Sequence, residues 1–223
     1  MTPRILEVRT KILKDNDRVA RALRERFNAA GVFVVSLVSS PGAGKTAFLQ
    51  KTLAALRETH RLAALVGDLA TDNDAQRLAA SGAPVRQIVT GTVCHLEAHM
   101  VEQALDGWSL EELDILFIEN VGNLVCPASY DLGEHLRVVL LSTTEGEDKP
   151  LKYPTIFNTS DIAVLTKMDL SEAVDFDREA ALRSIDSVRP GLTVINSSAK
   201  SADGMTAWLA YLQERAQQSL TAR

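Results

Sequence analysis

The chain is poor in cysteine, has no long apolar run and carries no excess of basic residues, and each scarcity excludes a class of protein. Two cysteines among 223 residues are too few for the disulfide framework of a small secreted domain. No stretch approaches the roughly 18 consecutive apolar residues of a membrane-spanning helix, and the first residues lack the apolar core of a signal peptide. The net charge of −5 argues against nucleic acid as the main partner. We therefore expect a cytoplasmic protein with neither a membrane nor a nucleic acid partner.

Strand and helix patterns alternate along the chain, which is long enough for one α/β domain with a sizeable core. Strands separated by helical patterns indicate βαβ units and a mostly parallel sheet of about seven strands, with ligand sites at the carboxyl ends of the strands. The polar, proline-containing segment 143–155 predicts a loop. The predicted strands cover 32–38, 62–67, 85–89, 113–119, 136–142, 161–165 and 192–196. The helices predicted between them cover 45–58, 73–81, 95–105, 177–187 and 204–217.

An amphipathic helix is predicted over residues 4–30, ahead of the first strand, and Gly31 provides a natural stop. Its continuous apolar stripe favours packing on the rest of the chain over use as a separate partner surface. We therefore divide the chain into an N-terminal helix, 1–31, and a main domain, 32–223. The stripe consists of Ile5, Val8, Ile12, Val19, Leu23 and Phe27.

The most informative segment is 39–46, SSPGAGKT, between a β-branched run and a helical pattern. Strand, glycine-rich loop and helix are the context of a phosphate-binding loop, and they predict a three-layer P-loop NTPase fold. Lys45 would reach the β- and γ-phosphates and the Thr46 hydroxyl would bind Mg²⁺, although Ser39 replaces the usual first glycine. Backbone N–H groups of the loop and the helix N-terminus would surround the phosphates. The residues expected to bind them are Gly42, Ala43, Gly44, Lys45, Thr46 and Ala47.

Two short segments that follow predicted strands favour GTP over ATP. In 166–169, TKMD, the Asp169 carboxylate can accept two hydrogen bonds from guanine, whereas adenine leaves it unpaired. The Lys167 stem can lie along the base plane, and Thr166 stands where asparagine is usual. The segment 198–200, Ser198, Ala199 and Lys200, resembles the S-A-K motif, whose central N–H bonds the guanine carbonyl.

Acidic residues at two further strand ends complete the predicted phosphate site. Asp68 and Glu119 are candidates for holding Mg²⁺ together with Thr46, and Gly122 can offer its N–H to the γ-phosphate, which would make 120–126 a switch segment. Asp74 is either a catalytic residue or a charge at a helix start. Neither a water-positioning glutamine nor an arginine finger is evident, so slow hydrolysis and a switch function are expected.

Cys94 and His95 are adjacent between a predicted strand and helix, and Cys126 follows the switch glycine by four residues. We expect the parent strands of the two loops to be neighbours, so that the three side chains converge. Thiolate and imidazole ligands suit Ni²⁺ or Zn²⁺, although a buried cysteine is more commonly a small apolar residue. Three ligands leave a four-coordinate site open, and water or a second subunit could complete it.

Taken together, five segments resemble the HypB family, the nickel-incorporation GTPases of [NiFe]-hydrogenase maturation. They are SSPGAGKT, GDLATDNDAQR, TGTVCHLEAHM, IENVGNLVCPASYDLGE and TEGEDKPLKYP. From the residues themselves we expect Lys45, Asp68, Asp74 and Glu119 to form the catalytic GTPase site. The resemblance implies Ni²⁺ or Zn²⁺ on Cys94, His95 and Cys126 at a GTP-dependent homodimer interface.

The same resemblance implies nickel delivery, together with a HypA-type metallochaperone, to the hydrogenase large-subunit precursor. It also implies that a lysine of the 143–155 loop, Lys149 or Lys152, approaches nucleotide or partner across the dimer. The chain lacks the N-terminal cysteine motif and the histidine-rich tract of some family members, which argues against high-affinity nickel storage.

Two other functions compete with this one. The urease accessory G proteins share the phosphate loop but carry a Cys-Pro-His metal motif, whereas this chain has Cys94 before His95 and Pro127 after the other cysteine. A P-loop kinase or ligase that acts on a small metabolite would usually use ATP, and the TKMD and SAK segments argue against it.

Overall fold

The computed structural model describes residues 4–69 and 73–221, with side chains described over 11–69 and 73–219. Within these residues, strands form one sheet in the order β3-β2-β4-β1-β5-β6-β7, and each neighbouring pair is parallel. The predicted α/β fold with about seven mostly parallel strands is therefore confirmed. The strands are β1 (Phe33–Ser39), β2 (Leu62–Asp68), β3 (Val85–Val89), β4 (Ile115–Glu119), β5 (Leu136–Ser142), β6 (Ile162–Thr166) and β7 (Thr193–Asn196).

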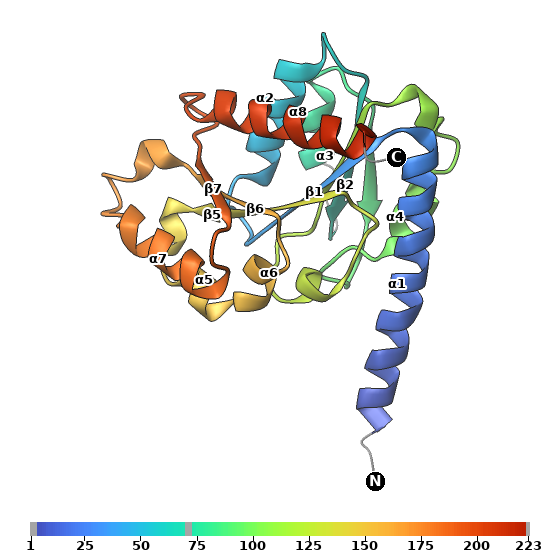
Figure 1. Cartoon of the computed structure of the whole chain (residues 1–223), viewed down its shortest axis with the longest axis horizontal. Helices are drawn as coiled ribbons and strands as arrows, with labels where there is room; N and C mark the ends of the chain where they lie inside the picture. Colours follow the sequence, from blue (N-terminus) through green and yellow to red (C-terminus); the bar gives the residue numbers. More distant parts are fainter. Residues whose placement is uncertain (1–3, 70–72, 222–223) are drawn as a thin grey trace.

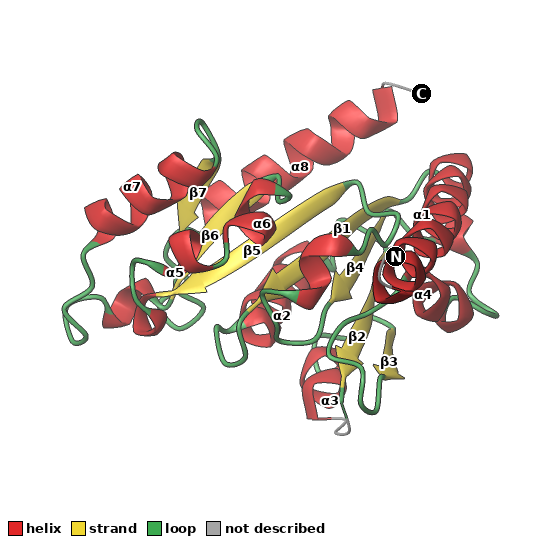
Figure 2. Cartoon of the chain, turned by 90° about the horizontal axis from the view of Figure 1, so that it is seen from below, coloured by secondary structure: helices red, strands yellow, loops and turns green. Residues whose placement is uncertain are grey.

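Helices cover both faces of the sheet, which gives the three layers that the phosphate-loop motif predicts (Figure 2). One face is covered by α2, α3 and α8, which share a core built around Phe48 and Trp208. The other face carries α1 and α4 at one end and α6 and α7 at the other. The helices are α1 (Arg4–Ala30), α2 (Lys45–Leu56), α3 (Asn73–Ala79), α4 (Ala98–Ala104), α5 (Lys149–Lys152), α6 (Pro154–Asn158), α7 (Arg178–Val188) and α8 (Met205–Thr221).

The N-terminal helix α1 has the predicted bounds but packs on the sheet only through its carboxyl-terminal half. Leu23 and Phe27 are buried in the core that α1 shares with α4, whereas Figure 1 shows the amino-terminal part extending past the body of the domain. The side chain of Ile12 is 44% exposed, so its predicted place in a packed stripe is wrong. Ile5 and Val8 of the predicted stripe lie outside the described side chains.

Segment 143–155 contains regular structure, so the prediction of a loop is wrong. A 3₁₀ turn, Thr143–Glu145, begins with a capping box directly after β5, and the short helices α5 and α6 follow it. A proline stands in the first turn of each of these helices, where its fixed φ favours a helix start. The polar composition therefore reflects short, exposed helices.

No helix among the described residues is long and apolar enough to cross a bilayer.

Candidate nucleotide and metal sites

The loop between β1 and α2 has the backbone shape of a phosphate-binding loop. Gly42 and Gly44 have φ angles of 74° and 98°, in the region where a side chain is strained. Helix α2 begins directly after the loop, so the N–H groups of its first turn lack partners within the helix. Lys45 Nζ donates to Ser39 Oγ at 3.0 Å, so the residue that replaces the first glycine holds the lysine. Burial lowers the pKa of Lys45.

Glu119, the last residue of β4, faces the same lysine from a buried position. Its Oε1 accepts a hydrogen bond from Thr46 Oγ1 at 2.7 Å, whereas Oε2 is buried and has no hydrogen-bond partner among the described residues. Burial raises the pKa of Glu119 to about 7, although Lys45 and the Thr46 hydrogen bond act in the opposite direction. A buried carboxylate oxygen without a partner, beside a threonine hydroxyl, fits the ligand set of a divalent cation.

A cavity of about 400 Å³ joins these groups to the other predicted phosphate-site residues. Asp68, Asp74 and Gly122 all line it. Gly122 lies against the phosphate loop, since a Cβ atom there would be 2.8 Å from Pro41 Cα. The wall also includes Arg77 of α3, a residue that the sequence analysis missed, with its Nη1 3.6 Å from Asp74 Oδ1. The sequence signal that could have identified Arg77 was helical spacing, because Arg77 lies four residues, or one turn, after Asn73 in the predicted helix 73–81.

The residues predicted to select guanine surround a second cavity of about 320 Å³, which shares Gly44 and Ala47 with the first. Thr166 Oγ1 donates to Ala43 O at 2.7 Å, and Lys167 Nζ donates to Gly42 O at 2.7 Å, so both are tied to the phosphate loop. Ser198 lies behind the wall, where its Oγ donates to Asp169 Oδ1 at 2.6 Å. The lining includes Thr166, Lys167, Asp169, Ala199 and Lys200.

Cys94, His95 and Cys126 come together as predicted, with one ligand atom of each lying within 4.8 Å of the others. The sulfur atoms of the two cysteines are 3.1 Å apart. The ring of His95 is tilted against that of Tyr130, with centroids 4.0 Å apart. Neither ring nitrogen makes a well-aligned hydrogen bond within the described part of the chain, although Glu97 Oε1 lies 3.4 Å from Nε2. Burial lowers the pKa of His95 although Glu97 raises it, so the neutral form that binds metals is favoured near neutral pH.

The route by which these loops meet differs from the prediction. Their parent strands β3 and β4 are not neighbours, because β2 lies between them. The loop that carries Cys94 instead crosses the carboxyl end of β2, where Leu96 is buried so close to Gly67 that a Cβ atom on the glycine would be 2.8 Å from it. The predicted helix 95–105 accordingly begins only at Ala98. The crossing also brings in Glu97, another residue missed in the sequence, whose Oε1 is 3.4 Å from His95 Nε2.

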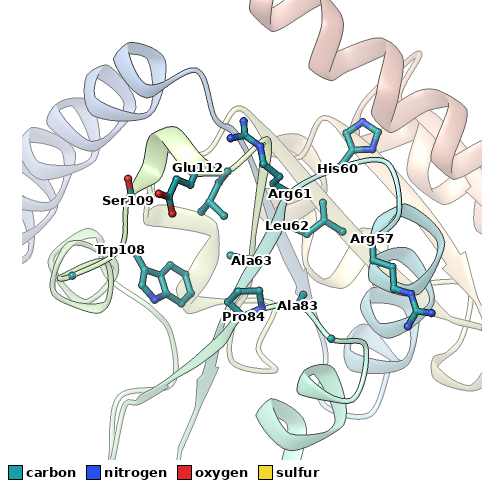
Figure 3. Close-up of a pocket in the computed structure, with 13 residues that line it drawn as sticks. Arg57, His60, Arg61, Leu62, Ala63, Ala83, Pro84, Trp108, Ser109 and Glu112 are labelled. Atoms are coloured by element: carbon teal, nitrogen blue, oxygen red, sulfur yellow. The ribbon is translucent and has the colours of Figure 1, made fainter.

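A larger cavity, about 460 Å³, lies away from both sites and contains none of the predicted residues. Figure 3 shows Trp108, Ala83 and Pro84 around it, with Arg57 and Arg61 at its edge. It is found at the amino ends of the strands. Ligands of parallel α/β sheets bind at the opposite edge, outside the carboxyl ends of the strands. Both guanidinium groups are already engaged by carboxylates, Arg61 with Asp114 at 2.6 Å and Arg57 with Glu58 at 3.0 Å. We assign no function to this cavity.

Known proteins match this chain over almost its whole length. A family profile described as CobW/HypB/UreG, nucleotide-binding domain, matches residues 33–196. The hydrogenase maturation factor HypB of Azotobacter chroococcum is 50% identical over 222 residues, which cover 99% of this chain and 72% of that protein. The chain belongs to the HypB family of hydrogenase maturation factors.

Solved structures of the HypB family share the fold closely. HypB from Helicobacter pylori, crystallised in complex with nickel, is 38% identical with a TM-score of 0.87, and the match covers 92% of this chain and 97% of that one. HypB from Archaeoglobus fulgidus is 35% identical with a TM-score of 0.85, over 91% and 99% of the two chains. The resemblance seen in the sequence, to HypB GTPases rather than to urease accessory G proteins or small-molecule kinases, is therefore confirmed.

The buried Glu119 makes the stability of the nucleotide-free protein depend on pH. Its folded pKa of about 7 exceeds its ordinary value of 4.5, so its contribution is complete below pH 4.5 and is lost as pH rises through 7. Between pH 5.5 and 8 the wild type should therefore lose about 2 kcal/mol more stability than Glu119→Gln. Urea unfolding of both proteins at the two pH values measures this difference. The same pH dependence in both proteins would show that Glu119 is ionised in the folded state throughout.

Proposed function

We propose that this chain is a GTP-hydrolysing metallochaperone that binds Ni²⁺ or Zn²⁺ and assists nickel insertion into the [NiFe]-hydrogenase large subunit. The observation that carries the proposal is the convergence of Cys94, His95 and Cys126 within 4.8 Å at one end of segment 119–126. The other end of that segment is Glu119, which contacts the phosphate-loop Thr46. One short segment therefore joins the nucleotide site to the metal ligands.

In the phosphate site, Lys45 and the N–H groups of residues 42–47 hold the β- and γ-phosphates. Thr46, Asp68 and Glu119 would hold Mg²⁺, and the partnerless Oε2 of Glu119 supports this assignment. The ion would neutralise phosphate charge. Deprotonation of Glu119 accompanies this binding because its pKa is near 7 in the free protein.

In the base site, Asp169 accepts hydrogen bonds from guanine and the Ala199 N–H donates to the guanine carbonyl. The contact from Ser198 fixes the Asp169 carboxylate. Thr166 is occupied with the Ala43 carbonyl, so its role is to join β6 to the phosphate loop. This contact gives threonine a structural role at the position where asparagine is usual.

Hydrolysis depends on few groups in this site. Asp74 and Arg77 both line the phosphate cavity, and they form an ion pair with each other at 3.6 Å. We assign Asp74 a catalytic role and Arg77 a positive charge beside the γ-phosphate. An arginine held by an aspartate within the same chain is less available than one inserted by a partner, which is consistent with slow intrinsic hydrolysis.

The metal site is completed by association. Three donors leave a four-coordinate ion open, and in a symmetric dimer the same patch of the second subunit supplies the missing donor. GTP favours this homodimer. Lys149 and Lys152 lie in the short helix α5, where Lys152 pairs with Asp148 at 2.6 Å, and one of them approaches nucleotide or partner across the interface. A HypA-type metallochaperone and the large-subunit precursor are the further partners, and the cytoplasmic location stays a prediction.

The test is nickel bound per subunit, measured with molecular mass, first with GDP and then with a non-hydrolysable GTP analogue. We expect a change in bound nickel that accompanies dimer formation in the analogue-bound state. Because coupling is reciprocal, nickel should change the affinity for the analogue by the same factor. Equal nickel content in both nucleotide states would contradict a GTP-gated carrier and leave a GTPase with a structural metal.

A further inference from the structure

Two asparagine side chains join the switch segment to the loop that carries Cys94 and His95. Asn120 directly follows Glu119, and its backbone N–H donates to Leu37 O at 3.0 Å, which extends the pairing of β4 with β1. The side chain of Asn120 contacts a different segment, the loop after β3, where its Oδ1 accepts a hydrogen bond from Leu96 N at 3.0 Å. The residue is 2% exposed. Asn120 therefore holds the residue after His95 at a fixed place relative to the end of β4.

The buried side chain of Leu96 strengthens this anchor. It lies against Gly67 at the end of β2, directly before Asp68. The backbone of Leu96 is thus bound to β4 while its side chain is packed on β2, the two strands whose ends carry the proposed Mg²⁺ carboxylates Glu119 and Asp68. The position of His95 is set by the same strand ends as the phosphate site.

The second contact lies beyond Gly122, in the part of the segment that leads to the thiol. Asn123 Nδ2 donates to Cys94 O at 3.3 Å, and Asn123 Oδ1 accepts from Val125 N at 2.8 Å. One amide therefore holds the backbone of Cys94 and shapes the turn before Cys126. Gly122, which touches the phosphate loop at Pro41, separates this contact from the anchor at Asn120.

We propose that Asn120 and Asn123 are positioning residues that transmit nucleotide state to the metal ligands. Asn120 is the fixed anchor, because its backbone N–H is hydrogen-bonded to Leu37 of β1. Asn123 is the moving link: a displacement at Gly122 carries Asn123, and its amide pulls the Cys94 carbonyl while His95 stays in place. The nucleotide state thereby changes the spacing of all three ligands rather than of Cys126 alone. This inference rests on the proposed function, since it requires that nucleotide and metal affinities are coupled.

Two aspartate variants separate the roles of the two amides. Asn120→Asp keeps an oxygen that accepts from Leu96 N, whereas Asn123→Asp replaces the donor to Cys94 O by an acceptor but keeps the bond from Val125 N. Asn123→Asp adds a negative charge beside Cys94, whereas Asn120→Asp adds one to the wall of the phosphate cavity, so the uncharged Asn123→Ala separates loss of the hydrogen bond from the effect of charge. The readout is the ratio of nickel dissociation constants in the GDP and analogue-bound states, which a merely structural role would not move.

We expect Asn123→Asp and Asn123→Ala to bring this ratio about fivefold closer to one, as loss of a single hydrogen bond predicts, and Asn120→Asp, which keeps the acceptor for Leu96 N, to change the ratio less than Asn123→Asp does. Asn28→Ala, an exposed position that bonds His135, is the control outside the sites. Thermal unfolding of each variant checks that it is folded. A wild-type ratio in both folded Asn123 variants would overturn the proposal. A ratio of one in the wild type would overturn the coupling itself, and the two failures are therefore distinguishable.

Discussion

Replacing Cys126 with alanine is expected to lower the nickel affinity by about 100-fold or more, because loss of a direct ligand exceeds the 10–100-fold effect of an outer-shell partner. Among the described residues this cluster has three donors, and the Cys126 sulfur lies 3.1 Å from that of Cys94. Removing one leaves a single thiolate and His95. The affinity is measured by competition with a coloured chelator, and the nickel–thiolate absorption should weaken at the same time.

The matched control for this variant is Val125→Ala, one residue earlier. Val125 is 61% exposed and carries no donor atom, so its truncation leaves the ligand set intact. Affinity for GDP should be retained in both variants because Cys126 is outside the cavity that holds the phosphate loop. Nickel binding by Cys126→Ala at the wild-type affinity would place the metal site elsewhere in the chain.

Replacing Asp169 with asparagine is expected to exchange the preference for guanine nucleotides for one for xanthine nucleotides. Asparagine presents a donor where the aspartate accepts, and xanthine carries a carbonyl where guanine has its 2-amino group. In the wild type, the Asp169 carboxylate facing the xanthine carbonyl would lose a hydrogen-bond donor. Such a loss at a charged acceptor costs about 2–4 kcal/mol, or roughly 30- to 1000-fold in affinity. The remaining carbonyl still accepts from Ser198 Oγ, which is 2.6 Å from the wild-type carboxylate. Dissociation constants of GDP and XDP for both proteins give the ratio.

Asp175→Asn is the control for this exchange, because Asp175 is exposed and its φ of 51° suits asparagine equally well. It should leave the ratio of GDP to XDP affinity unchanged. If Asp169→Asn retains the wild-type preference for GDP, the cavity between Ala47 and Lys200 is not the base site, and the assignment of 166–169 fails.

The secondary structure was predictable where burial and local propensity agree. Buried strands such as β5 and β6 consist almost entirely of apolar residues, so continuous runs marked them and their ends differed by a residue or so. Segment 143–155 escaped because polar, proline-containing composition is shared by loops and by short exposed helices. The prediction that Ile12 of α1 is packed was wrong. Periodicity identifies the apolar face of a helix, but it does not show whether the rest of the domain extends far enough to cover that face.

The sequence by itself determined the chemistry of this protein. The donor types, the glycine conformations of the phosphate loop and the carboxylates at strand ends are properties of residue identity and local spacing, and five segments were enough to indicate the HypB family. Only the tertiary structure decided how these groups are joined. Cys94 and Cys126 meet because a loop crosses the end of β2, and Arg77 enters the phosphate cavity because α3 lies beside α2. Such contacts depend on strand order and on packing between distant segments, which no local pattern in a single sequence encodes.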